Sequence, residues 1–217
     1  WYIDLLNGAI EACGGPSTVF NCVAEPTIES AQALMNHPDI RLLVVTGGGG
    51  VVKAAMASGK RAIAAGPGNP PVVVDETADV ARAARDLVFG ASLDNNIICI
   101  VEKEIIAVAD IADALKREMT RNHAVEVRGR DLKQLEKLLI TPDNHVNRDY
   151  IGKDAAVILA DAGIRVPEST RMAFAEVDEQ HPFVQHEMLL PVLGFVRVPN
   201  VDEAIAAAVR CEHGFGH

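Results

Sequence analysis

Cys99 has the most distinctive chemical setting in the sequence. It follows the polar Asp94-Asn95-Asn96 turn and stands inside the apolar run from Ile97 to Ile100. A thiolate at such a junction is a good nucleophile, and backbone N–H groups of the turn could stabilise an oxyanion on a carbonyl that it attacks. The alternative is a small core residue, because unpaired cysteines are among the most buried residue types. Both interpretations stay open on these residues alone.

A second group of chemically useful side chains lies between His181 and Glu187. Two imidazoles, His181 and His186, stand close to the Glu187 carboxylate in a segment predicted to be a loop before a strand. Such groups exchange protons near neutral pH and suit general acid–base chemistry. The alternative is a solvated loop, because polar residues of this kind are mostly exposed.

Two glycine-rich turns come directly after predicted strands. Residues 46–50 read Thr-Gly-Gly-Gly-Gly before a predicted helix, where glycines let a phosphate approach backbone N–H groups at a helix N-terminus. The stretch matches no phosphate-binding fingerprint, so an ordinary strand-to-helix turn is the alternative. Residues 66–71 read Gly-Pro-Gly-Asn-Pro-Pro, and this stiff segment either lines a pocket or only turns the chain.

The elements that position these residues alternate between helix and strand. Periodicity and end signals predict helices over 2–13, 27–35, 51–58, 77–89, 111–119, 132–139, 154–162 and 201–211. Aliphatic and β-branched runs predict strands over 18–23, 40–46, 61–65, 72–74, 104–108, 170–177 and 193–198. Asp110 and Asn200 are the predicted N-caps of the helices that begin after them. This alternation is typical of an α/β fold with a parallel sheet.

Composition excludes several classes of function. A net charge of −10 argues against nucleic-acid binding, and no apolar run reaches the roughly 20 residues that a membrane span requires. The four cysteines show no C-x-x-C spacing, so we expect a reducing compartment, no disulfide framework and no metal. Cys13 and Cys22 fall in predicted apolar elements. The chain starts inside a predicted helix without a methionine or a leader, so we expect a piece of a longer polypeptide.

Four stretches together resemble the aldehyde dehydrogenase superfamily. Within it, they resemble the CoA-acylating acetaldehyde and propionaldehyde dehydrogenases that often work inside bacterial microcompartments. The stretches occur in the family's order and approximate spacing: Thr46 to Gly48, Ala65 to Asp75, Ala91 to Cys99 and His186 to Leu193.

This resemblance implies specific roles for residues and ligands. Cys99 would be the nucleophile that carries the acyl group, and His186 would accept the thiol proton of CoA. The implied cofactor-binding residues are Thr46, Gly47, Gly48, Glu187 and Leu189. The implied cofactor is NAD, with NADP as the alternative, and coenzyme A is the co-substrate of a short-chain aldehyde.

The resemblance also implies an architecture and a cellular setting. Residues 1–93 would belong to a Rossmann-type NAD-binding domain and residues 94–217 to an α/β catalytic domain, each of them partial. The full-length protein would be a homo-oligomer in the cytoplasm or in a microcompartment lumen, with shell proteins or lumen enzymes as partners.

One departure from the wider superfamily bears on the product. Hydrolytic members carry a glutamate that activates water where this sequence has Ala64. Without that base, a thiol is the better second nucleophile, which favours a thioester product. The alternatives are a hydrolytic aldehyde or semialdehyde dehydrogenase that gives a free acid, and a non-catalytic nucleotide-binding module in which Cys99 is only packed.

Overall fold

The computed structural model describes residues 1–215 and divides into two compact units after Ala65. This division does not coincide with the predicted domain boundary between Leu93 and Asp94. Residues 66–93 contribute a strand that pairs with the strand Glu104–Val108 and a helix that packs on the helix Ala109–Arg121, so they belong structurally to the unit that starts at Gly66. The assignment of the two parts as nucleotide-binding and catalytic domains stays a prediction.

The first unit (residues 1–65) contains a two-stranded parallel sheet and three helices. Its elements are α1 (Tyr2–Ala12), α2 (Ile28–Asn36), β1 (Leu42–Thr46), α3 (Gly49–Ala57) and β2 (Arg61–Ala65). The helix α3 connects the two strands, as expected for parallel neighbours. Val44 and Ile63 are paired across the two strands, and their side chains are 73% and 62% exposed.

The prediction of a strand over residues 18–23 is wrong, because the structure has no strand there. The backbone of this segment is bound by the Asn7 side chain instead: Oδ1 accepts from the N–H groups of Val19 and Phe20, and Nδ2 donates to the Phe20 carbonyl. The β-branched and aromatic residues of this segment suggested a strand, but its hydrogen-bonding groups have a side-chain partner on α1 rather than a neighbouring strand.

The second unit (Gly66 onward) contains a five-stranded parallel sheet of order β3-β4-β7-β6-β5. The strands are β3 (Pro71–Val74), β4 (Glu104–Val108), β5 (Ala124–Glu126), β6 (Met172–Glu176) and β7 (Val192–Val198). Every residue of the second strand in this order, β4, is buried. An all-parallel sheet confirms the predicted α/β class, although β5, only three residues long, was not expected from the sequence.

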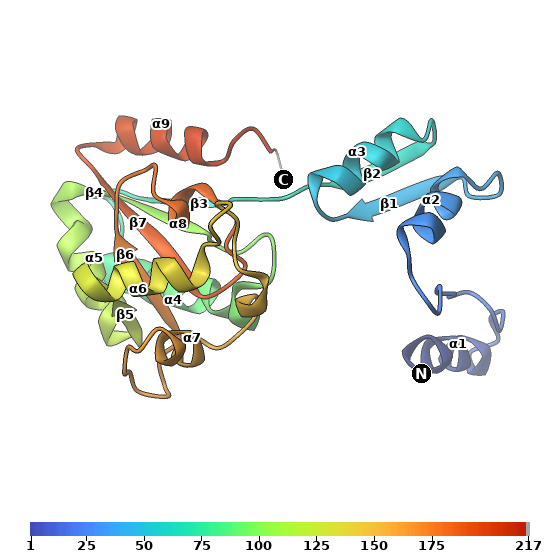
Figure 1. Cartoon of the computed structure of the whole chain (residues 1–217), viewed down its shortest axis with the longest axis horizontal. Coiled ribbons are helices and arrows are strands. Elements are labelled where there is room, and N and C mark those ends of the chain that lie inside the picture. The colour runs from blue at the N-terminus through green and yellow to red at the C-terminus, as the bar shows by residue number, and fades with distance from the viewer. Residues whose placement is uncertain (216–217) are drawn as a thin grey trace. The chain divides into compact units, whose positions relative to one another are not determined.

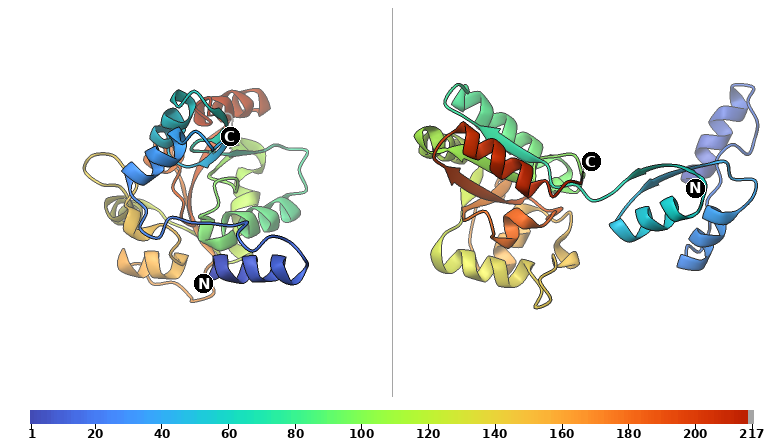
Figure 2. Two further views of the ribbon diagram at one scale, coloured as in Figure 1. Left: turned by 90° about the vertical axis from the view of Figure 1, so that its right-hand side faces the viewer. Right: turned by 90° about the horizontal axis from the view of Figure 1, so that it is seen from above.

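Helices cover both faces of this sheet (Figures 1 and 2). They are α4 (Val80–Ala91), α5 (Ala109–Arg121), α6 (Gly129–Leu139), α7 (Ala155–Asp161), α8 (Pro182–Gln185) and α9 (Val201–Cys211), with two 3-10 turns, η1 (Leu93–Asn96) and η2 (Arg148–Tyr150). Ile105 and Ala107 of β4 pack against α4 and α5, whereas the alternate residues Ile106 and Val108 pack against α9. The sheet therefore has buried apolar packing on both faces.

The helix ends confirm one predicted cap and correct two other predictions. Asp110 does not cap α5, because that helix begins at Ala109, two residues earlier than predicted, and Val108 occupies the N-cap position. Asn200 does cap α9, its Oδ1 accepting a hydrogen bond from Glu203 N. The segment expected as a loop before a strand contains the short helix α8, which has Pro182 at its start and the His181 side chain as its cap.

Within residues 1–215, no helix is long and apolar enough to cross a membrane. The same part of the chain contains no group of three or more His, Cys, Asp or Glu side chains that could hold a metal ion.

Candidate active site

Three segments from different parts of the sequence meet at the amino edge of the five-stranded sheet. They precede β3, β4 and β7, whose first residues lie close together because the strands are parallel and in register. The segment before β4 carries Cys99 in a turn, where its side chain is half-buried. The segment before β7 carries His186 and Glu187, and the segment before β3 is the Gly-Pro turn of residues 66–70.

The turn that carries Cys99 has an unusual backbone. Asp94, Asn95 and Asn96 are three consecutive residues in the left-handed region, with φ of 45°, 52° and 65°. Side chains other than glycine rarely adopt this conformation, and Asn and Asp tolerate it best. A run of three such residues needs support from the surrounding structure.

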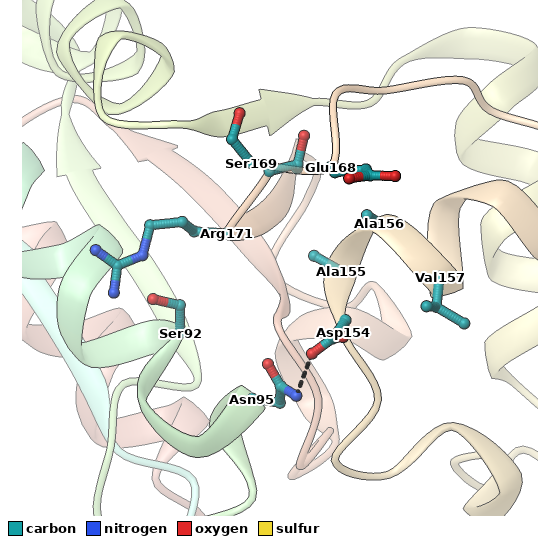
Figure 3. A pocket seen from close by; sticks show the side chains of 10 residues that line it. Ser92, Asn95, Asp154, Ala155, Ala156, Val157, Glu168, Ser169 and Arg171 are labelled. Atoms are coloured by element: carbon teal, nitrogen blue, oxygen red, sulfur yellow. Dashed lines mark hydrogen bonds between the residues drawn. The ribbon is translucent and has the colours of Figure 1, made fainter.

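Two asparagine side chains supply part of that support. Asn95 Nδ2 donates to Asp154 Oδ1 at 2.7 Å and to the Gly152 carbonyl at 3.0 Å, and Figure 3 shows the bond to Asp154 beside a cleft. Asn96 is fully buried, and its Nδ2 donates at 2.9 Å to the carbonyls of Ala91 and Glu102. The turn is thus tied to the segment before α7, to the end of α4 and to the segment before β4.

Lys103 supplies the rest of the support. Its side chain is only 1% exposed, and Nζ donates to the Asn96 carbonyl at 2.8 Å, to Asn96 Oδ1 at 2.7 Å and to the Ile98 carbonyl at 2.9 Å. Burial lowers the pKa of Lys103 to about 8, against the opposing attraction of Glu187 and Cys99. A cation therefore lies beneath the cysteine turn, and it was not identified from the sequence. The signal was a lysine inside the charged Glu102-Lys103-Glu104 stretch that leads directly into a buried strand.

Glu104, the first residue of β4, is a second buried ionisable group. It is fully buried, and among the described residues neither carboxyl oxygen has a hydrogen-bond partner. Burial raises the pKa of Glu104 to about 9, against the opposing charge of Lys103. The carboxyl group is therefore protonated at neutral pH, and Lys103 keeps most of its charge.

Glu187 connects the other two segments. Its Oε1 accepts a hydrogen bond from Gly68 N at 3.3 Å, and its charge attracts the Lys103 ammonium. The carboxylate borders a cleft of about 570 Å³ that is also lined by His145, Arg148 and Ile151. A half-buried carboxylate at the edge of a cleft can accept hydrogen bonds from ligand hydroxyl groups.

The His186 imidazole has one nitrogen that makes no hydrogen bond within the described part of the chain. Its Nε2 is buried and has no hydrogen-bond partner among residues 1–215. Burial is the main cause that lowers the pKa of His186, and the neighbouring imidazoles of His145 and His213 act in the same direction. The ring is therefore neutral at neutral pH and can accept a proton.

Close packing fixes the segment that carries His186 and Glu187. A Cβ atom at Gly194 of β7 would lie 2.3 Å from Val184 Cγ2 and 3.1 Å from the Phe183 carbonyl oxygen, so α8 sits directly on the strand. Leu189 has a φ of 54°, which is unusual for a bulky residue, and its carbonyl accepts from Gly152 N. Leu189 therefore joins this segment to the Gly152 region that also holds the cysteine turn.

The remaining predicted site residues, Thr46, Gly47 and Gly48, belong to the first unit. Thr46 ends β1, Gly47 N donates to the Ala65 carbonyl at 3.2 Å, and Gly48 occupies the N-cap position of α3. A Cβ atom at Gly48 would meet no other atom within 4 Å. The predicted sequence of strand, glycine turn and helix N-terminus is confirmed, with the helix starting at Gly49.

The other cysteines differ from the expectation. Cys13 and Cys22 are exposed rather than packed in apolar elements, because the strand predicted around Cys22 does not form. Cys211 is fully buried at the end of α9, and burial raises its pKa to about 12.

Comparison with known proteins agrees with this arrangement. The sequence profile described as the aldehyde dehydrogenase family matches residues 3–140. The chain belongs to this family. It is 51% identical to the acetaldehyde dehydrogenase (acetylating) EutE of Escherichia coli K12, over 99% of this chain and 47% of that protein. It thus spans about half the length of the curated relatives it matches.

Solved structures are similarly close. A propionaldehyde dehydrogenase from the Clostridium phytofermentans fucose utilisation bacterial microcompartment superimposes with a TM-score of 0.94 at 42% identity, covering 98% of this chain and 49% of that chain. A Rhodopseudomonas palustris propionaldehyde dehydrogenase with bound CoA and an acylated cysteine superimposes with a TM-score of 0.93 at 45% identity, covering 97% and 48%.

Proposed function

We propose that this chain is part of a CoA-acylating aldehyde dehydrogenase that oxidises a short-chain aldehyde to its acyl-CoA, with Cys99 as the nucleophile. The observation that carries the proposal is the placement of Cys99 on a turn held by Asn95, Asn96 and Lys103. The acetylating activity named for EutE and the acylated cysteine of the Rhodopseudomonas enzyme support it.

In the first half-reaction, the Cys99 thiolate attacks the aldehyde carbon and forms a C–S bond. The carbonyl oxygen becomes an oxyanion that backbone N–H groups of the turn can stabilise. Collapse of this adduct to a thioester releases the aldehyde hydrogen with its electron pair. NAD, when bound, supplies the hydride acceptor for this step.

In the second half-reaction, thiolysis by CoA transfers the acyl group. The CoA sulfur forms a bond to the thioester carbon, the bond to Cys99 breaks, and Cys99 leaves as a thiolate. We assign the proton of the CoA thiol to Nε2 of His186, because this nitrogen is unpartnered among the described residues and belongs to a neutral ring. Ala64 of β2 supplies no base to water, so thiolysis is favoured over hydrolysis.

The residues fit a nicotinamide dinucleotide. Glu187 offers a half-buried carboxylate for ribose hydroxyl groups, with Leu189 two residues further along the same segment. Around Gly48 there is open space next to the N-terminus of α3, where backbone N–H groups are exposed. We propose that Thr46, Gly47 and Gly48 in the first unit, and Glu187 and Leu189 in the second, are cofactor-binding residues and that NAD is preferred to NADP. Comparison of kcat/KM for the two cofactors tests this preference.

Product analysis of the intact protein tests the activity. With NAD and a panel of aldehydes, we expect acyl-CoA in the presence of CoA and little free acid in its absence. Cys99→Ala should abolish NADH formation, whereas Cys13→Ala, which removes an exposed thiol of the first unit, should not. Free acid as the main product at saturating CoA, or full activity of Cys99→Ala, would contradict the proposal.

Stopped-flow kinetics separates the role of His186. His186→Ala should slow steady-state turnover by on the order of 10²- to 10⁴-fold, the usual contribution of a general base, while the initial burst of NADH remains. His37→Ala, in the first unit, is the matched control. Loss of the burst itself would assign His186 to the first half-reaction instead.

We also propose that the full-length protein is a homo-oligomer and works in a microcompartment lumen. The microcompartment origin of the Clostridium relative supports this setting. Native mass determination, and co-purification of the tagged protein with shells isolated from its own host, test the two parts separately.

A further inference from the structure

We propose that Lys103 is a positioning residue that holds the Cys99 turn and provides a fixed positive charge for the thiolate. This inference rests on the proposed role of Cys99, and it assigns to the buried lysine a part in the chemistry.

The side-chain hydrogen bonds of Lys103 go to the turn that precedes Cys99. Its Nζ has three partners: the Asn96 carbonyl, Asn96 Oδ1 and the carbonyl of Ile98, the residue directly before Cys99. An ammonium group has three N–H donors, so these three bonds use all of them. The same side chain thus fixes the last of the three left-handed residues and the backbone next to the nucleophile.

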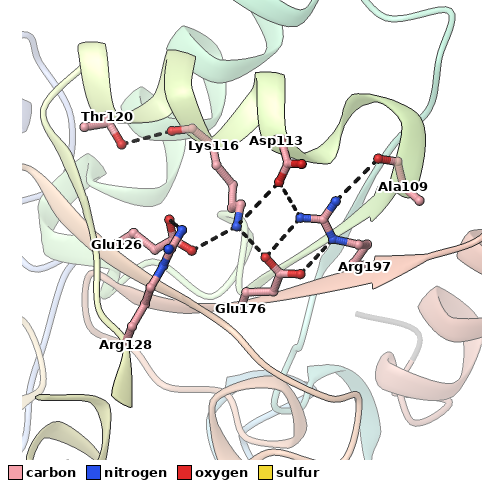
Figure 4. A network of polar contacts seen from close by, with 8 residues as sticks. All are labelled: Ala109, Asp113, Lys116, Thr120, Glu126, Arg128, Glu176 and Arg197. Atoms are coloured by element: carbon pink, nitrogen blue, oxygen red, sulfur yellow. Dashed lines mark hydrogen bonds and ion pairs between the residues drawn. The ribbon is translucent and has the colours of Figure 1, made fainter. Parts of the chain in front are cut away.

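The three hydrogen-bond partners of Lys103 carry no charge, so they do not neutralise its ammonium group. All three are neutral oxygens. The other buried lysine, Lys116 of α5, shows the contrast: its Nζ contacts the carboxylates of Glu126 and Glu176, in a network that includes Arg197 (Figure 4). Carboxylate partners neutralise the charge of Lys116, whereas carbonyl dipoles only solvate that of Lys103.

The groups that face Lys103 are Glu187, Cys99, Glu102 and Glu104. Glu104 is protonated at neutral pH and contributes no charge there. Cys99 is the group in this set that must gain a negative charge for the reaction to begin. A cation that is 1% exposed is little screened by water, so a protonated Lys103 can stabilise negative charge that develops on the Cys99 sulfur during its attack.

If the charge of Lys103 assists Cys99, the reactivity of Cys99 should depend on the titration of Lys103, which a purely structural role does not require. Because the pKa of Lys103 is about 8, its charge is present at pH 7 and is largely lost by pH 9 to 10. Assistance to the thiolate should therefore fade over this range. Hydrogen bonding would change less, since a neutral amine keeps two of its three N–H donors for the oxygens of the turn.

Iodoacetamide alkylation of Cys99 in the intact protein, followed by mass spectrometry from pH 6.5 to 10, tests this. Lys103→Met keeps the length of the side chain without its charge, and we expect alkylation to be slower than in wild type on the order of tenfold at pH 7, with the ratio approaching one by pH 10. Lys103→Arg keeps the positive charge and should recover most of the wild-type rate at pH 7. Lys116→Met is the matched control and should leave the rate unchanged.

A second variant separates charge from hydrogen bonding. Lys103→Gln is neutral but can still donate to the turn, so we expect it to fold and to react as slowly as Lys103→Met at pH 7. A ratio of wild-type to variant rates that is the same at every pH would overturn the charge role, and wild-type rates in Lys103→Gln would do so as well. Alkylation does not require turnover, so either result would leave the proposed function standing, whereas full activity of Cys99→Ala would overturn that function instead.

Discussion

Replacement of the buried Glu104 by glutamine should make the stability of the protein less dependent on pH. The folded state holds the Glu104 carboxyl group protonated up to about pH 9, whereas the unfolded chain releases the proton near its ordinary value of 4.5. Since the folded pKa is raised, stability is full below pH 4.5 and decreases as the pH rises toward 9. Glutamine is neutral throughout, so Glu104→Gln removes this loss.

The size of the effect depends on the separation of the two pKa values. Each pH unit above 4.5 costs about 1.4 kcal/mol while the folded carboxyl remains protonated. At pH 7 the accumulated loss is about 3 kcal/mol, an upper value that Glu104→Gln should recover. Near pH 4.5 the folded wild type and the folded Glu104→Gln variant both carry a neutral, buried polar group without hydrogen-bond partners. Their free energies of unfolding should therefore agree there to within about 1 kcal/mol.

Urea unfolding of the intact protein at pH 5, 6, 7 and 8 measures this difference. We expect the gap between Glu104→Gln and wild type to widen with each pH unit. Glu76→Gln, which changes an exposed glutamate near β3, is the control and should run parallel to wild type. Parallel curves for Glu104→Gln, or a variant less stable than wild type by the same amount at every pH, would refute the assignment of a protonated buried carboxyl.

Three further variants or conditions test other parts of the second unit. Gly194→Ala should lower the free energy of unfolding by about 1–3 kcal/mol through overpacking against Val184 and the backbone beside it, and Val184→Ala in the same background should restore part of it, as thermal unfolding would show. Hydrogen bonds from Arg197, and to a smaller extent from Lys116, lower the pKa of Glu176 to about 2. Their contribution to stability is therefore present above pH 4.5 and is lost as the pH falls toward 2. The free energy of unfolding should differ less between pH 5 and pH 3 in Arg197→Met than in wild type. Cys211 should stay unlabelled by iodoacetamide at pH 8 while the exposed cysteines of the first unit react.

A specific result would contradict each of these three predictions. Wild-type stability of Gly194→Ala would show that α8 can move away from β7. An unchanged acid response in Arg197→Met would mean that the Glu176 pair contributes little to folding. Rapid labelling of Cys211 in the native protein would show that the end of α9 opens.

The sequence predicted the second unit well because its signals are local and consistent. The strand at residues 104–108 is short, aliphatic and buried on both faces, and α9 has the cap at Asn200 that its sequence indicates. The failures occurred where a tertiary contact decided the outcome. Asn7 binds the backbone of residues 19–20, and β5 exists only because β6 is available to pair with it.

The candidate site was only partly accessible to sequence reasoning. The resemblance singled out Cys99, His186 and Glu187, and the fold brings the segments that carry them to one edge of the sheet. Lys103 was missed because a lysine beside two glutamates normally indicates a solvated surface, and only the register of β4 places it inside. The three left-handed residues were foreseen as a turn, but which side chains secure them depends on residues nearly 60 positions away.

The two-stranded sheet of the first unit bears on how this polypeptide should be handled. Val44 and Ile63 project from adjacent strands into solvent, and among residues 1–215 each strand has the other as its only β-partner. Two strands rarely persist alone in water, and the unpaired backbone edge of each strand offers hydrogen bonds to any extended chain nearby. A preparation of this polypeptide by itself is therefore expected to aggregate through the first unit. Charged replacements at these two positions would be the first choice for keeping it in solution for spectroscopy.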